Sequence, residues 1–165
     1  MVVFLKKTFL SITILLMLNT NLFAKHSIEY MGIKLGEVHN FNSLKDNYIE
    51  AKVTNSIAKM ILNKEKVVLY NEKYNKPKSD KKTKYKKERS SLIDLLKSVY
   101  KGTVKEGEII VNNKKKILLK KKDNKFFYEF IRLGKETKTG FFVVENNELI
   151  ELVENEDNIK IRKIN

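Results

Sequence analysis

The strongest constraint on the fold is a series of short apolar segments between residues 108 and 164, which polar two-residue turns separate. Asn112-Asn113, Asp123-Asn124 and Asn146-Asn147 stand between segments rich in Ile, Leu, Val and Phe. Asn and Asp tolerate the left-handed backbone that tight hairpin turns require. The pattern therefore predicts successive antiparallel strands over residues 108–111, 117–121, 126–133, 140–145, 149–154 and 159–164.

The N-terminal half carries the same pattern less regularly. Residues 48–54 alternate, with Ile49, Ala51 and Val53 on one face, which predicts a half-buried strand and the second arm of a hairpin. The remaining segments are a strand over 26–35 that glycine interrupts or bends, an extended stretch over 66–74, a helix or a strand over 55–62, and a lysine-rich edge strand over 82–89.

Residues 90–102 carry the clearest helical pattern. Four apolar residues between positions 92 and 99 recur at helical spacing, a serine before them supplies the N-cap, and Gly102 ends the helix. The sequence therefore predicts a mainly β fold, a curved antiparallel sheet or open barrel of hairpins with one short α-helix midway.

The N-terminus has the three parts of a secretion signal. A basic start with Lys6 and Lys7 precedes the uncharged, mostly apolar residues 8–18, and a polar break then leads to the small residue Ala24. This order is typical of a signal peptide, so we expect residues 1–24 to be a signal that is cleaved after Ala24.

Cleavage would leave residues 25–165 as a single mainly β domain of the bacterial cell envelope, located in the periplasm and without a transmembrane anchor. The alternative is a retained anchor, although the apolar run is shorter than the roughly 20 residues that span a bilayer. The chain has no cysteine, which excludes disulfides, thiolate metal sites and an acylated cysteine. We therefore expect a packed apolar core to hold the domain together.

The chain is strongly basic, with 34 Lys and Arg against 20 Asp and Glu. Without residues 1–24 its net charge would be +12, and two segments, 73–89 and 114–125, carry most of that excess. Clustered positive charge attracts anionic partners, which in an envelope are lipid head groups, lipopolysaccharide phosphates and acidic polymers. The alternative is that the lysines only solvate strand faces and loops. Export and the lack of a binding motif argue against nucleic acid as a partner.

Three motifs resemble a known family. These are Tyr30–Glu37 with its spaced glycines, Tyr48–Ala51, and the aspartate-containing segment Ser91–Tyr100 followed by Glu106-Gly107. Together they resemble the exported bacterial family catalogued as domain of unknown function 3108, over about residues 28–163. The resemblance implies an envelope location and a mostly β architecture. It implies no activity and lends no functional residues.

The residues give no pattern typical of catalysis. His26 and His39 are predicted to be ordinary surface residues, so we expect no metal site and no cofactor. The acidic residues between 145 and 157 are expected to offset lysines across a hairpin. Ser90, Ser91 and Asp94 are explained by helix capping. We therefore expect that the protein is not an enzyme.

The aromatic residues between 126 and 142 are expected either to pack in the core or to line an apolar groove. Adjacent residues on a strand face opposite sides, so both faces of this part of the sheet carry phenylalanine. One interpretation packs one face as core and the other under the helix; the other is a curved sheet that holds an acyl chain.

Our leading hypothesis is a non-enzymatic carrier or binding protein for a lipid-like or anionic envelope component. Its apolar interior would be lined by Phe127, Phe130, Phe142 and Leu96, and its anionic head-group site by Lys82, Lys84, Lys86, Lys115 and Lys121. The alternatives are a structural or assembly factor that docks another envelope protein through a sheet edge, and electrostatic attachment to a polymer or membrane surface.

Overall fold

The computed structural model describes residues 24–75 and 80–164. The predicted secretion signal lies outside the described residues except for Ala24. The first strand, β1 (Lys25–Tyr30), begins directly after the predicted cleavage position.

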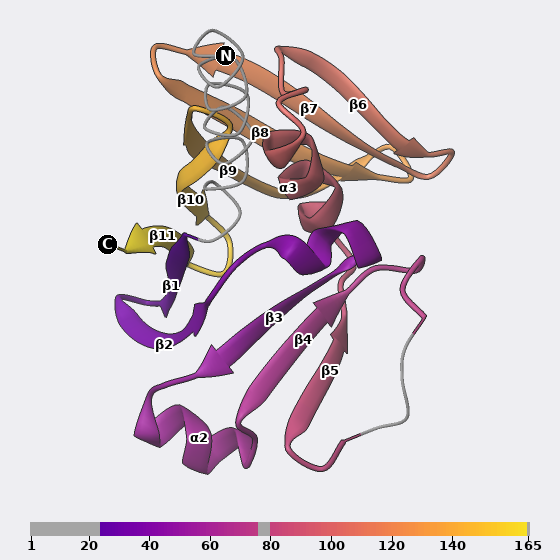
Figure 1. Ribbon diagram of the computed structural model, residues 1–165. Coiled ribbons are helices and arrows are strands. Elements are labelled where there is room, and N and C mark those ends of the chain that lie inside the picture. The colour runs from indigo at the N-terminus through magenta and orange to yellow at the C-terminus, as the bar shows by residue number, and fades with distance from the viewer. Residues whose placement is uncertain (1–23, 76–79, 165) are drawn as a thin grey trace, which may run out of the picture.

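All eleven strands of the described residues belong to one open sheet, in the order β5-β4-β3-β2-β1-β11-β10-β9-β8-β7-β6 (Figure 1). Two meanders meet where β1 pairs with β11, so the strands nearest the two ends of the chain lie in the middle of the sheet. The other strands are β2 (Ile33–Val38), β3 (Tyr48–Val53), β4 (Lys66–Tyr70), β5 (Thr83–Lys87), β6 (Gly107–Asn112), β7 (Lys115–Lys122), β8 (Lys125–Arg132), β9 (Lys135–Glu145), β10 (Glu148–Glu154) and β11 (Ile159–Ile164).

The predicted fold class, a curved, mainly β sheet with a short helix midway, is confirmed. One pair departs from the antiparallel pattern, because β5 lies parallel to β4 with Lys66 opposite Thr83. The predicted edge strand over residues 82–89 is confirmed as β5, and β6 forms the other edge. The short helices beside the sheet are α2 (Ser56–Leu62), α3 (Leu92–Tyr100) and the 3-10 helix η2 (Asn42–Asp46).

Helix α3 fills the inside of the curved sheet. It lies between strands β6–β10 and strands β3–β5 (Figure 1). Its residues Ile93, Leu95 and Leu96 are fully buried in a core that also receives side chains from β2, β3 and β7–β11. Because the sheet wraps around a single apolar helix, its two ends approach one another.

The N-terminus of α3 is capped differently from the prediction. Ser91 occupies the N-cap position, but its side chain makes no capping bond. The backbone N–H of Leu92 instead donates to Oε2 of Glu88, 3.1 Å away, and the Ser90 hydroxyl donates to the same oxygen. A carboxylate from the end of β5 therefore replaces the predicted serine.

The structure decides two alternatives that the sequence left open. Residues 26–35 are interrupted rather than bent, because Met31 and Gly32 both adopt positive φ and form a tight turn between β1 and β2. Residues 55–62, for which the sequence left helix and strand open, form α2, and the Asn55 side chain accepts a bond from the backbone N–H of Ala58.

A substitution at Gly140 would test how closely strands β9 and β10 pack. A Cβ atom at this position would lie 2.0 Å from the carbonyl oxygen of Val153 and 2.6 Å from the hydroxyl of the buried Tyr128. We expect Gly140→Ala to lower the free energy of unfolding by about 1–3 kcal/mol, because the β9–β10 backbone must shift. Gly32→Asn is the control, since a Cβ there meets nothing within 4 Å and Asn tolerates positive φ. If urea unfolding showed the same loss of stability for both variants, Gly140 would not lie as close to Val153 and Tyr128 as the structure places it.

Candidate functional site

The predicted apolar lining residues do not all share one face. Leu96, Phe130 and Phe142 are fully buried in the core around α3. Phe127 is exposed on the opposite face of the sheet, where its ring centroid lies 6.1 Å from that of Phe141. The structure therefore brings three of the four predicted residues together and leaves Phe127 apart.

Two of the five predicted head-group lysines come together. Lys86 on β5 and Lys115 on β7 line the same pocket. Lys82 instead pairs with Glu65 at 3.1 Å, and Lys121 lies near the opposite end of β7, 5.5 Å from the ring of Phe126. Lys84 is exposed on β5 and does not line that pocket.

The shared pocket lies where the two ends of the sheet meet. Glu72, which follows β4, accepts a hydrogen bond from the Asn112 side chain at 3.0 Å and pairs with Lys115 at 3.3 Å. These contacts join the β4–β5 end to the β6–β7 end. The resulting pocket, which we call the Glu88 pocket, has a volume of about 640 Å³ and is lined by Glu72, Tyr85, Lys86, Lys87, Glu88, Arg89, Lys115 and Arg132.

The Glu88 pocket has a marked excess of positive charge. Five of its lining residues are basic and two are acidic. The basic groups come from three places in the chain, namely β5 and the residues after it, the start of β7, and the end of β8. Cations that converge from separate elements favour an anion in the space between them.

Glu88 is the unusual member of this pocket. Its side chain is only 5% exposed, and its Oε1 atom has no hydrogen-bond partner among the described residues. Burial, with a smaller contribution from the charge of Asp94, raises the pKa of Glu88 to about 7, and the ammonium of Lys115 opposes this rise. Because Oε2 accepts two bonds and the buried Oε1 accepts none, Oε1 is the oxygen better able to carry a proton.

Glu88 is not among the site residues that the sequence predicts. It stands within the lysine-rich segment 73–89, where the excess of positive charge is the dominant feature. An available signal was a single acidic residue placed directly before the helix start at Ser90-Ser91, where a carboxylate satisfies free backbone N–H groups.

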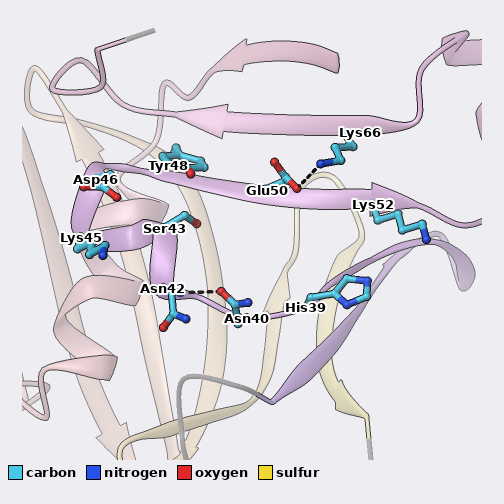
Figure 2. Close-up of a pocket in the computed structure, with 10 residues that line it drawn as sticks. All are labelled: His39, Asn40, Asn42, Ser43, Lys45, Asp46, Tyr48, Glu50, Lys52 and Lys66. Carbon is cyan, nitrogen blue, oxygen red and sulfur yellow. Dashed lines mark hydrogen bonds and ion pairs between the residues drawn. The ribbon is translucent and has the colours of Figure 1, made fainter. Parts of the chain in front are cut away.

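A second pocket, of about 560 Å³, lies between η2, β3 and β4 (Figure 2). Its lining mixes Lys45, Lys52 and Lys66 with Asp46 and Glu50, and Lys66 pairs with Glu50 at 2.9 Å. His39 lies at its edge and is exposed. Because its charges largely balance, this pocket has a weaker preference for anions than the Glu88 pocket.

His26 is not the surface residue that the sequence predicted. It is fully buried, its ring lies against that of Phe41 at 4.9 Å, and its Nε2 lies 2.7 Å from the carbonyl oxygen of Leu149. Burial lowers the pKa of His26, so the neutral ring is favoured. This histidine joins β1 to β10 and is part of the core.

The predicted pairing of acidic residues across hairpins is confirmed. Glu148 pairs with Lys163 at 2.8 Å, Glu151 pairs with Arg162 at 3.0 Å, and Glu154 pairs with Lys138. In the part of the chain that the structure describes, no group of three or more His, Cys, Asp or Glu residues could hold a metal ion. Over the same residues, no helix has the length and apolar character needed to cross a membrane.

No family model, no curated protein and no solved structure matches the chain. The resemblance to domain of unknown function 3108 therefore stays a prediction from three sequence motifs.

The buried carboxyl makes stability depend on pH. The pKa of Glu88 is raised in the folded state from 4.5 to about 7, so its neutral form is favoured and stability falls as pH rises through that window. We expect Glu88→Gln to be more stable than the wild type by up to about 3 kcal/mol at about pH 8, and equally stable at about pH 4. Urea unfolding at both pH values measures this. If Glu88→Gln and the wild type differed in stability by the same amount at both pH values, the pKa of Glu88 would not be raised by burial.

Proposed function

We propose that this chain is a non-enzymatic, exported binding protein that holds the anionic group of an envelope component in the Glu88 pocket. The observation that carries the proposal is that five basic residues, from both ends of the sheet, line one pocket together with a buried carboxyl group. The periplasmic location rests on the predicted signal over residues 1–24.

The pocket suits an oxyanion, such as the phosphate, sulfate or carboxylate of a lipid head group or acidic polymer. The guanidinium of Arg132 and the ammonium of Lys115 supply charge-assisted hydrogen bonds. Protonated Glu88 carries no charge and would not oppose an anion, whereas ionised Glu88 would repel it. If the ligand is a lipid, only its head group would lie in the Glu88 pocket. Its acyl chain would not enter the core, because Leu96, Phe130 and Phe142 are packed there.

A second candidate function is docking of another envelope protein at the β6 edge. Among the strands that the structure describes, β6 is the last of the sheet and pairs with β7 alone. Its sequence includes Ile109, Ile110 and Val111, and Ile110 is exposed, whereas the other edge, β5, carries three lysines. Lysines protect an edge from added strands, so β6 is the better edge for strand addition.

Sulfate is a suitable first ligand for the anion site, because its charge does not change between mildly acidic and mildly basic solution. We expect Lys115→Gln and Arg132→Gln each to weaken sulfate binding by about tenfold, since each removes one charge-assisted contact. Isothermal titration calorimetry measures the dissociation constants. We also expect the wild type to bind more tightly at about pH 6 than at about pH 8, and Glu88→Gln to remove that difference.

Lys121→Gln is the matched control. It makes the same change of charge on the same strand, six positions from Lys115, which is about 20 Å along β7. We expect less than a twofold effect from it. Equal weakening by Lys121→Gln and Lys115→Gln would mean that sulfate responds only to overall charge, and the proposed site would then be wrong.

A further inference from the structure

A second surface of the molecule carries most of its exposed apolar side chains. Six of the nine large hydrophobic residues that are exposed among the described residues lie on the β1–β2 turn and on α2. They are Tyr30, Met31, Ile33, Ile57, Met60 and Ile61, and we call them the apolar patch. Exposed apolar groups that gather in this way mark an interaction surface.

The two halves of the apolar patch belong to neighbouring elements. The backbone N–H groups of Thr54 and Asn55, just before α2, both donate to the carbonyl oxygen of Leu35 on β2, at 3.1 and 3.2 Å. Gly36 is also opposite Val53 in the β2–β3 pair. In Figure 1 the β1–β2 turn lies at the left of the view and α2 lies below it.

Helix α2 presents its apolar residues outward. Ile57, Met60 and Ile61 are spaced three and four positions apart and so share one face. Ala58, on another face, is buried against the rest of the molecule. Met60 and Ile61 are 77% and 75% exposed.

Lysines lie close to the apolar patch in the sequence. Segments 30–35 and 52–66, which contain it, hold five lysines and one acidic residue, and two of these lysines are paired with acids outside the segments, Lys34 with Glu37 and Lys66 with Glu50. Lys59 lies on α2 itself, Lys64 follows the helix, and Lys34 follows Ile33 on β2. An apolar centre with cations near it complements a bilayer surface, where acidic head groups lie above acyl chains.

We propose that the apolar patch docks the protein onto the surface of an anionic lipid bilayer. The side chains of α2 and the β1–β2 turn enter the head-group region, and the nearby lysines contact lipid phosphates. This surface lies apart from the Glu88 pocket, because none of its residues lines that pocket. The protein would therefore bind an anionic component while held at the membrane from which that component comes.

Flotation with lipid vesicles tests the docking surface. Protein purified from a periplasmic extract is mixed with vesicles of phosphatidylglycerol and phosphatidylcholine in equal parts, or of phosphatidylcholine alone. We expect binding to the mixed vesicles, and weaker binding to the neutral ones or in high salt. We expect the double variant Met60→Ser, Ile61→Ser to bind the mixed vesicles about tenfold less, because it removes two inserted side chains.

The control is the double variant Ile110→Ser, Leu133→Ser, whose positions are 76% and 66% exposed but belong to β6 and the β8–β9 turn. We expect it to bind vesicles like the wild type. Wild-type binding by the Met60→Ser, Ile61→Ser variant, equal loss in both variants, or no vesicle binding at all would overturn the proposal. So would a concentration-dependent dimer that only the patch variant lacks, because the patch would then cover a second copy.

Membrane docking through the apolar patch and anion binding in the Glu88 pocket can be tested separately. Lys115→Gln should float with vesicles like the wild type, and the Met60→Ser, Ile61→Ser variant should bind sulfate like the wild type. If Lys115→Gln instead abolished flotation, the bilayer would be contacted through the Glu88 pocket and the docking surface would be wrong.

Discussion

The structure depends on the packing of one apolar helix inside a curved sheet. Ile93, Leu95, Leu96 and Val99 of α3 are buried against side chains from both meanders, so the sheet must curl around the helix to cover them. Burial of large aliphatic side chains stabilises a domain by about 1.5–3 kcal/mol each, and this chain has no disulfide to add to that. The curl in turn brings the two ends of the sheet, β4–β5 and β6–β7, near one another.

The Glu88 pocket is a consequence of that curl. Glu88 lies between β5 and the start of α3, where it accepts a bond from the backbone N–H of Leu92 and lines the pocket together with residues of β5, β7 and β8. Its capping oxygen is used by the helix, while its other oxygen faces no partner among the described residues. One side chain thus caps the helix and lines the pocket, and the neighbouring Lys115 and Arg132 contribute to the positive charge of that pocket.

Local patterns were sufficient to predict the elements but not the site. Alternation and Asn-rich turns predicted the hairpins of residues 107–164, and helical spacing predicted α3, because both depend on neighbours in the sequence. Glu72, Lys86 and Lys115 come together because the two ends of the sheet approach one another, which no local pattern contains. His26 shows the same limit, since its burial depends on Phe41 and on Leu149, 123 positions away. Phe127 was grouped with the wrong face for a simpler reason: the hypothesis listed it with Phe130, although an odd and an even position on one strand point to opposite sides.

The most direct test of anion binding is an NMR titration of the ¹⁵N-labelled protein with inorganic phosphate, followed by the backbone amide signals. Binding in the Glu88 pocket predicts saturable shifts concentrated at residues 86–92 and at Lys115 and Arg132, with little change around Lys121. Small, non-saturating shifts spread over all lysine-rich segments would contradict it, because they would show that the positive charge acts only as a diffuse surface property.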